Sequence, residues 1–341
     1  MSSLLGPIAE SSRSDMPSPH EIEVVIGIAS SALFDLHESD KVFREQKEDA
    51  YREFQEERLN DPLAPGVAFD FVRRLLSLND LAKDRSPLIE VVILSRNDPE
   101  TGARVMESVR HHGLPITRSV FMQGRAPYKF MDAFNMTLFL SADEDDVRAA
   151  IARDFFAGQV VGEPGSLSLE DGDDGNSLRI AFDFDGVLAD DQAETVYQES
   201  KDLDVYKAHE DEHGAEPLSA GPLQPFLAAL NKIQEIEDDL KRENESYNRR
   251  LHIGIVTARN APAHVRPITT LKHWGLRVND IFFLGGWPKA DTLKIYGPHI
   301  FFDDQTDHVD KTKSVVPSVH IPFGVTNKAT GAEASPEVPK T

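Results

Sequence analysis

The chain repeats itself at two closely related spacings, and this internal repeat constrains the fold more than any other feature of the sequence. Residues 61–66, DPLAPG, resemble residues 216–221, EPLSAG, at a spacing of 155. Residues 112–114, HGL, resemble residues 274–276, WGL, at a spacing of 162. The seven additional residues of the second copy fall in the charged stretch 235–248. One steady spacing, an insertion and a second steady spacing indicate two homologous halves.

The repeat divides the chain into segments. We expect homologous halves at residues 21–160 and 178–325, joined by an acidic, glycine-containing linker at 161–177. A length of 341 residues suits about two domains. The two ends, residues 1–20 and 326–341, have no sustained apolar stretch, which predicts a disordered leader and a disordered tail.

Each half shows the same alternation of short apolar runs and helical stretches. Apolar runs of four to six residues, bounded by turn signals and separated by helices, are typical of buried parallel strands in an α/β fold. We therefore predict two Rossmann-like halves with parallel sheets, in which chemistry collects at the carboxyl ends of the strands. The predicted strands are 23–28, 89–94, 119–122 and 137–140 in the first half and 178–182, 251–256, 281–284 and 299–302 in the second.

Composition excludes several classes of function and partner. The net charge of −22 argues against a nucleic-acid partner, because phosphate backbones repel an acidic surface. No apolar run approaches the roughly 18 residues that a membrane span needs, and the first residues do not read as a secretory signal. Cysteine is absent, which excludes disulfides and thiolate metal sites and fits a reducing compartment such as the cytoplasm. An acidic protein that acts on an anion needs local positive charge, which a metal ion would supply.

Four carboxylates follow two of the strands predicted in the second half. Asp183 and Asp185 come after the first strand, and Asp303 and Asp304 come after the fourth. A carboxylate can attack phosphorus as a nucleophile, and an acid two residues away can protonate the leaving alkoxide and then activate water. Carboxylate oxygens from two strand ends can also hold Mg²⁺, which prefers them together with substrate phosphate. The four acids therefore indicate phosphoryl transfer and a candidate Mg²⁺ site.

Two further residues at strand ends suit the same chemistry. The hydroxyl of Thr257 and the ammonium of Lys289 can neutralise the non-bridging oxygens of a phosphate. Gly186 permits a sharp turn of the chain beneath that phosphate. Taken singly, these residues have ordinary structural explanations as a helix N-cap, a surface lysine or a turn. Their common order at successive strand ends favours the chemical explanation.

This order of motifs resembles that of the haloacid dehalogenase superfamily of phosphohydrolases. The resemblance implies an aspartate nucleophile that forms an aspartyl-phosphate, a neighbouring general acid and base, two phosphate-binding residues and a second acidic pair that binds the metal. Asp183 corresponds to the nucleophile and Asp185 to the general acid and base. Thr257 and Lys289 correspond to the phosphate-binding residues, and Asp303 and Asp304 correspond to the metal-binding acidic pair.

A closer resemblance, from about residue 24 to residue 325, is to the cytosolic type I 5′-nucleotidases. It covers the first half as well, which generic phosphatases of the superfamily lack. One position departs from the family, which usually has a DGDA-like loop at residues 183–186, here DFDG. The segments that carry the resemblance are SSALF (30–34), LSAD (140–143), GPL (221–223), FLAAL (226–230), VTAR (256–259), HWGL (273–276) and PHIFFDDQ (298–305).

The resemblance implies Mg²⁺-dependent hydrolysis of nucleoside 5′-monophosphates, AMP above all, by a cytoplasmic enzyme. It also implies a nucleotide effector and assembly into a homo-oligomer. The stretch of about 190–250 is then expected to be a small helical cap over the site. Two alternatives stay open: a phosphatase of the same mechanism that acts on another small phosphomonoester, such as a sugar phosphate, and a nucleotide sensor without turnover.

The first half has lost the acids of the second. At the positions that match Asp183, Asp185, Asp303 and Asp304, it carries Ile28, Ser30, Ser141 and Ala142. It is therefore predicted to be non-catalytic. Ser95 matches Thr257, and Lys129 lies near the match of Lys289, so one hypothesis gives this half a phosphate-binding pocket for an effector or substrate. The alternative is a purely structural partner.

Overall fold

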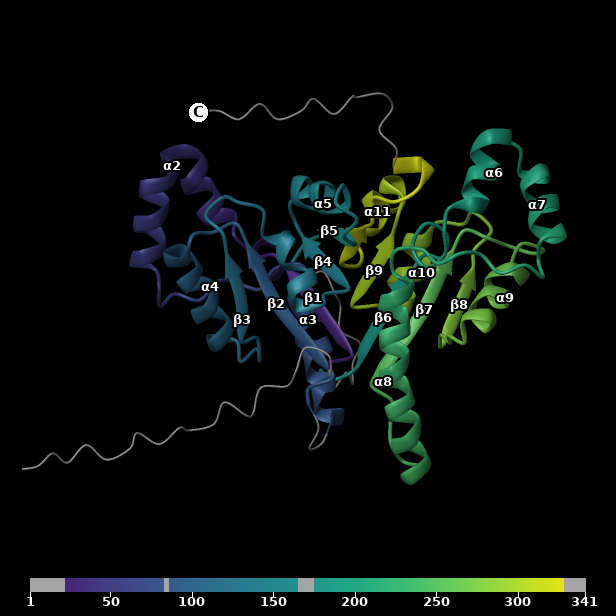
Figure 1. Cartoon of the computed structure of the whole chain (residues 1–341), viewed down its shortest axis with the longest axis horizontal. Coiled ribbons are helices and arrows are strands. Elements are labelled where there is room, and N and C mark those ends of the chain that lie inside the picture. Colours follow the sequence, from purple (N-terminus) through teal and green to yellow (C-terminus); the bar gives the residue numbers. More distant parts are fainter. Residues whose placement is uncertain (1–21, 83–85, 165–174, 328–341) are drawn as a thin grey trace, which may run out of the picture.

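The computed structural model describes residues 22–82, 86–164 and 175–327 (Figure 1). The leader predicted at 1–20, most of the predicted linker and nearly all of the predicted tail lie outside these residues. None of the described helices combines the length and the hydropathy required to cross a lipid bilayer.

The described strands form one ten-stranded sheet in the order β3-β2-β1-β4-β5-β10-β9-β6-β7-β8. The strands of each half are parallel to one another, and the two sets meet where β5 pairs antiparallel with β10. The sequence predicted a parallel sheet in each half, and in the structure these two sheets are joined into one continuous sheet. Its strands are β1 (Val24–Ile28), β2 (Ile89–Ser95), β3 (Arg118–Phe121), β4 (Leu138–Ser141), β5 (Ala157–Val161), β6 (Leu178–Phe182), β7 (Leu251–Thr257), β8 (Asp280–Phe283), β9 (Ile300–Asp303) and β10 (Ser318–His320).

The strand order is the same in the two halves. Read outward from the junction, the first half runs β5-β4-β1-β2-β3 and the second runs β10-β9-β6-β7-β8. The eight predicted strands are confirmed to within one residue at each end. The fifth strand of each half, β5 and β10, was not predicted, and these two strands join the halves.

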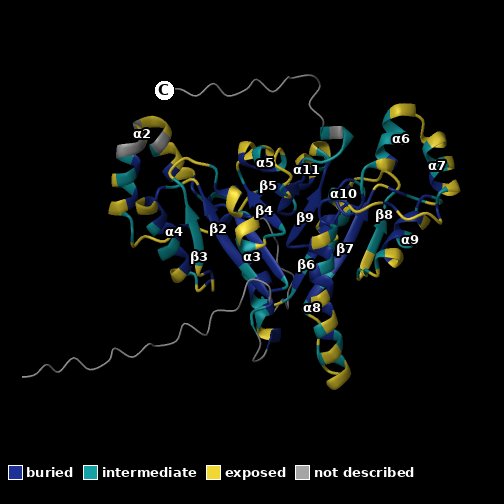
Figure 2. Ribbon diagram, in the orientation of Figure 1, coloured by how far each residue is buried: buried dark blue, intermediate teal, exposed yellow. Residues whose placement is uncertain are grey.

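Helices cover the sheet and its edges (Figures 1 and 2). The shorter 3₁₀ turns include η2 (Pro127–Phe130) in the first half. The helices are α1 (Ser30–Leu33), α2 (His37–Glu57), α3 (Phe69–Ser77), α4 (Pro99–His111), α5 (Glu144–Ile151), α6 (Gln192–Ser200), α7 (Leu203–Glu212), α8 (Gln224–Glu243), α9 (Val265–Trp274), α10 (Lys289–Tyr296) and α11 (Thr306–Thr312).

A pair of helices follows the first strand of each half. In the second half these are α6 and α7, with Lys201 in the left-handed conformation (φ 52°) between them. In the first half α2 occupies the equivalent stretch, and Lys47 (φ 73°) breaks it at the corresponding point. Figure 1 shows α2 at the upper left of the molecule and α6 and α7 at the upper right. Helices thus follow the first strand at equivalent places in the two halves.

Helix α8, which lies within the stretch 190–250 expected to form a cap, packs against the sheet of the second half. The ring of Phe226 on α8 lies edge-on to Phe182 of β6 and to Phe302 of β9, with centroids 6.2 Å apart in both cases. The far end of α8 extends past the sheet in Figure 1, and the additional residues of the second copy fall there. Of the helices in the expected cap stretch, α6 and α7 are the two that stay candidates for it.

The two halves share one hydrophobic core. Val24 and Ile26 of the first half belong to the same buried cluster as Leu178 and Ile180 of the second. The fully buried Arg74 reaches across the junction and donates a hydrogen bond from Nη1 to the carbonyl of Ser177 at 2.8 Å. A shared core and a shared sheet make the halves one packing unit.

Candidate active site

Asp183 lies directly after β6 and is almost completely buried, with 4% of its surface exposed. Its backbone N–H donates to the carbonyl of Phe302 at 2.7 Å, so the chain still follows the sheet at this point. Its Oδ1 accepts from the N–H of Phe184 at 2.7 Å, which leaves Oδ2 directed to the neighbouring strand ends. Burial raises the pKa of Asp183 to about 6, with the repulsion of Asp303 adding to the shift and the attraction of Lys289 opposing it.

Lys289 bridges two of the predicted acids. It is the first residue of α10, it is buried, and its Nζ lies 2.7 Å from Asp183 Oδ2 and 2.7 Å from Asp303 Oδ2. Burial alone would lower the pKa of this ammonium, but the two carboxylates outweigh it and raise the pKa. At Asp303 burial raises the pKa, but Lys289 and His308 together outweigh it, so the pKa of this carboxyl is lowered. The lysine is therefore a fixed positive charge between two strand ends.

Asp304 lies against the turn that follows Asp183. Gly186 has a φ of 71°, and a Cβ at this position would lie 2.6 Å from the Asp304 carboxyl carbon. The turn therefore needs glycine both for its conformation and for the space that Asp304 fills. Burial, together with the charges of Asp183 and Asp303, raises the pKa of Asp304 to about 9. This site therefore gathers more carboxyl groups than one lysine can compensate.

The donor groups fit a divalent cation. Ligand atoms of Asp183, Asp303 and His308 all lie within 4.8 Å of one another, and His308 Nδ1 is 3.3 Å from Asp303 Oδ2. The raised pKa values of Asp183 and Asp304 reflect carboxylates crowded together out of water, an arrangement that a bound cation relieves. Of the four predicted ligands, Asp183 and Asp303 belong to this group, whereas Asp304 lies against Gly186 and Asp185 is paired with Arg259.

Thr257 ends β7 and is buried, in line with its expected place at the sheet edge. Its Oγ1 accepts a hydrogen bond from the N–H of Arg259 at 3.3 Å. All six predicted residues thus lie at or just beyond the carboxyl ends of β6, β7 and β9 or at the start of α10.

A buried ion-pair network connects Asp185 to the cap. The guanidinium of Arg259 donates two hydrogen bonds to Asp185, from Nε to Oδ2 at 2.7 Å and from Nη2 to Oδ1 at 2.6 Å. Its Nη1 also binds Glu210 on the cap helix α7, and Arg266 Nη1 donates to the second oxygen of Glu210 at 2.8 Å. Glu210 is completely buried, and the two arginines outweigh the effect of burial and lower its pKa. One carboxylate of the cap therefore holds the arginine that orients Asp185.

Sequence reasoning missed His308, Arg259 and Glu210 as parts of this site. The only signal available was position: Arg259 is two residues past the end of β7, and His308 is four residues past Asp304. Glu210 stands in an acidic run, HEDEH at 209–213, that is typical of a solvated surface. Its complete burial depends on partners more than 45 residues away in sequence.

Of the two residues predicted to bind phosphate in the first half, only Ser95 lines the cavity of that half. Ser95 ends β2 and is buried, and its hydroxyl lies 3.0 Å from that of Ser30. Lys129, on η2, is exposed to solvent and is not among the residues that line the cavity beside Ser95. Lys129 therefore does not take the place in the first half that Lys289 has in the second.

Comparisons with known proteins place the whole described chain in one family. A family model described as 5′-nucleotidase matches residues 16–328. The chain is also 32% identical over 292 residues to the human protein Cytosolic 5′-nucleotidase 1B, covering 84% of this chain and 47% of that protein. It thus spans about half the length of this curated relative. No solved structure matches the chain significantly.

Proposed function

Because the chain belongs to the 5′-nucleotidase family, we propose that it is a Mg²⁺-dependent hydrolase of nucleoside 5′-monophosphates, with AMP as the model substrate. One observation carries the proposal beyond the family: Lys289 Nζ lies 2.7 Å from both Asp183 and Asp303. A buried nucleophilic carboxylate, a fixed cation and a second acid at one sheet edge are the groups that phosphoryl transfer requires.

In the proposed reaction, Asp183 Oδ2 attacks phosphorus and the bond from phosphorus to the 5′-oxygen breaks. Asp185 gives a proton to that oxygen, and the nucleoside leaves. Asp185 then takes a proton from a water molecule, which attacks the aspartyl-phosphate and restores Asp183 with the release of inorganic phosphate. Both oxygens of Asp185 accept from Arg259, so one of these two bonds opens when Asp185 carries the proton, and the other keeps the carboxyl group in place.

Positive charge stabilises the phosphate oxygens during these steps. Lys289 and the hydroxyl of Thr257 are proposed to bind the non-bridging oxygens. Oxygens of Asp183 and Asp303 would hold Mg²⁺ together with His308, with Asp304 and Asp185 as the other proposed ligands, and the ion when bound would supply further positive charge against the phosphate. The cap helices α6 and α7 exclude water from the reacting group.

The remaining expectations follow from the family and from the repeated strand order. We propose that the halves are a catalytic and a degenerate copy of a haloacid dehalogenase-like unit. The relative's name describes a cytosolic protein, and we propose the cytoplasm for this chain as well. A homo-oligomer and a nucleotide effector stay predictions.

Release of inorganic phosphate from a panel of phosphate esters tests the proposed function. With Mg²⁺ present, AMP and other nucleoside monophosphates should be hydrolysed with a higher kcat/KM than sugar phosphates. Asp183→Asn should lower kcat by at least about a thousandfold, because it removes the nucleophile with little change of volume, while nucleotide binding is retained. A clear preference for sugar phosphates would favour the alternative phosphatase, and near-normal turnover by Asp183→Asn would refute the mechanism.

A further inference from the structure

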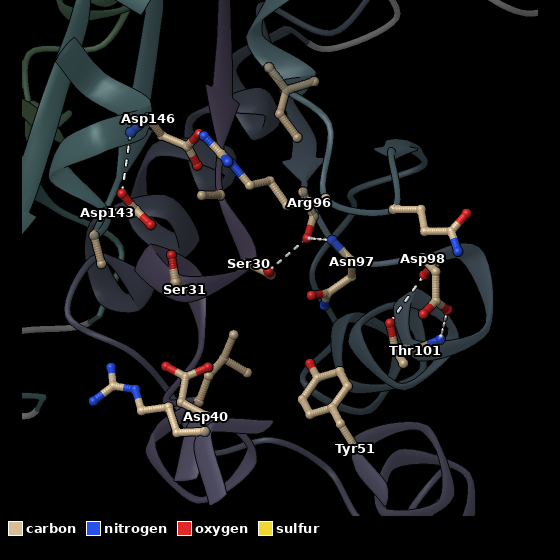
Figure 3. A pocket seen from close by; sticks show the side chains of 18 residues that line it. Ser30, Ser31, Asp40, Tyr51, Arg96, Asn97, Asp98, Thr101, Asp143 and Asp146 are labelled. Carbon is tan, nitrogen blue, oxygen red and sulfur yellow. Dashed lines mark hydrogen bonds and ion pairs between the residues drawn. The ribbon is translucent and has the colours of Figure 1, made fainter. Parts of the chain in front are cut away.

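A cavity of about 790 Å³ opens in the first half at the carboxyl ends of its strands (Figure 3). Its floor is formed by Ser30 after β1, by Ser95 at the end of β2 and by Asp143 after β4. Helix α2 contributes Asp40 and Tyr51 on the other side. This is the place in the first half that the candidate active site occupies in the second.

The groups proposed to handle phosphate in the second half are missing from this cavity. Ile28 and Ser141 stand where the second half has Asp183 and Asp303. Ser95 is present, but its hydroxyl already bonds to Ser30 at 3.0 Å and accepts from the N–H of Asn97 at 3.1 Å. Without a buried lysine or an acidic metal site, the cavity has no equivalent of the proposed phosphate site.

The charges that line the cavity also disfavour an anion. It is lined by four aspartates, at positions 40, 98, 143 and 146, and by two arginines, at positions 44 and 96. Two of these aspartates are already paired with arginines, since Arg96 Nε donates to Asp146 at 2.6 Å and Arg52 Nε donates to Asp98 at 3.2 Å. Asp40 and Asp143 then stand against Arg44 alone, and this smaller acidic excess still disfavours a phosphate dianion and offers acceptors to a ligand that carries hydroxyl or N–H groups.

The rest of the lining suits a neutral, partly apolar ligand. Hydroxyl and amide side chains come from Ser31, Asn97 and Thr101, and apolar surface comes from Leu36 and Leu94. The volume lies in the range of about 300–1,000 Å³ that is common for small-molecule sites, and such sites combine apolar walls with a few polar groups.

We propose that this cavity binds a neutral nucleoside, at a site separate from the candidate active site. A nucleoside offers several hydroxyl and N–H donors and an apolar base, and it carries no phosphate to meet the acidic lining. The choice of a nucleoside among neutral polar molecules rests on the proposed function, because it is the uncharged product of that reaction. The geometry thus favours a nucleoside over the phosphate-bearing ligand expected from Ser95 and Lys129.

Hydrogen–deuterium exchange of the full chain in EDTA tests the inference, with adenosine and inorganic phosphate as separate probes. Adenosine should slow backbone exchange in peptides covering 36–51 and 94–101 by about threefold or more, and inorganic phosphate should not. Ser31→Trp, which fills the cavity, should abolish this protection. Thr117→Trp, at an exposed residue before β3, is the matched control and should keep it.

A second variant guards against misfolding. Asn97→Leu removes a polar group of the cavity lining at nearly constant side-chain volume. This variant should weaken the protection by adenosine at least about fivefold. Its rate of AMP hydrolysis with Mg²⁺ should stay within about twofold of that of the parent chain. Adenosine protection that is absent from these peptides, or unchanged in both variants, would overturn the proposal, as would protection by inorganic phosphate. Loss of AMP hydrolysis in the parent chain would instead count against the proposed function, because the exchange experiment needs no turnover.

Discussion

At the scale of single residues, Lys289 should matter most for the proposed reaction. It is the buried cation that touches both Asp183 and Asp303. Lys289→Ala should lower kcat/KM for AMP by about a hundredfold or more, equivalent to about 2.7 kcal/mol, because a fixed charge against the phosphate is lost. Steady-state phosphate release measures this. Lys294→Ala, at an exposed lysine of the same helix, is the control and should be neutral.

Asp304 should make the metal-free protein less stable as the pH rises. Its pKa is raised by burial from 3.8 to about 9 in the folded chain. Between these values the folded state holds a proton that the unfolded state has released, so the free energy of unfolding falls with increasing pH, by at most about 1.4 kcal/mol per pH unit. Melting temperatures in EDTA, measured from about pH 5 to pH 9, should fall more steeply for the parent than for Asp304→Asn.

Added Mg²⁺ should reverse this trend. A cation that binds only the folded state raises the melting temperature, and it competes with the proton for the same carboxylates. The stabilisation by Mg²⁺ should therefore be larger at high pH than at low pH, and smaller in Asp304→Asn. Parallel pH profiles for parent and variant in EDTA would show that Asp304 does not titrate in this way.

How much of the site the sequence can predict also depends on the residue. Asp183, Lys289 and Asp303 were predictable because strand ends of a parallel sheet meet at one edge, and each residue is within one position of an element boundary. Glu210 and His308 were not, because their partners are set by how the cap and α11 pack. A side chain in an acidic or polar helix carries no sequence signal for such burial.

At the scale of elements, Glu210 should control how the cap helix α7 is held. Replacing it with glutamine removes the charge that pairs with two buried arginines, Arg259 and Arg266. Breaking a buried ion pair of this kind costs about 3 kcal/mol or more, so the free energy of unfolding should drop accordingly. Denaturant titration measures the loss, with Glu212→Gln at an exposed position of α7 as the control.

A kinetic measurement separates this cap function from simple destabilisation. With Arg259 no longer held by the cap, Asp185 loses its fixed orientation, and kcat for AMP should fall by about tenfold at a temperature where the variant is fully folded. Exchange of backbone amides in α6 and α7 should accelerate, while that in β6 and β9 should not. An unchanged kcat in the folded variant would mean that the network only stabilises the structure.

The elements themselves divide into predictable and unpredictable strands for a physical reason. Six of the eight strands found from sequence are mostly buried apolar runs, such as VVIGI in β1 and IEVVILS in β2, and β3 and β8 at the two sheet edges are partly buried. β5 (AGQVV) and β10 (SVH) mix glycine or polar residues with valine, and β10 has only three residues. The pairing of these two strands with each other joins segments about 160 residues apart, which no local pattern reports.

At the scale of the whole molecule, the junction between the halves is closely packed. Val160 of β5 pairs with Val319 of β10, and neighbouring Gly158 lies beneath the second half. A Cβ at Gly158 would lie 2.4 Å from Val319 Cγ1 and 2.7 Å from Ile321 Cδ1. The contact leaves no room for a side chain, so the approach of the halves depends on this glycine.

Gly158→Val should therefore impair the candidate active site, although Gly158 lies in the first half and all the proposed catalytic residues lie in the second. The added methyl groups push against β10, which pairs with β9, and β9 carries Asp303. Overpacking of this kind costs about 1–3 kcal/mol or more, and the shared core should make both halves unfold in one transition at a lower temperature. Calorimetry and AMP hydrolysis measure the two effects. Gln159→Val, at the next position of the same strand, is the control and should have a much smaller effect on both measurements. Because the halves share one sheet and one core, neither should stay folded when the other unfolds. Two separate calorimetric transitions would contradict this and show that the halves fold independently.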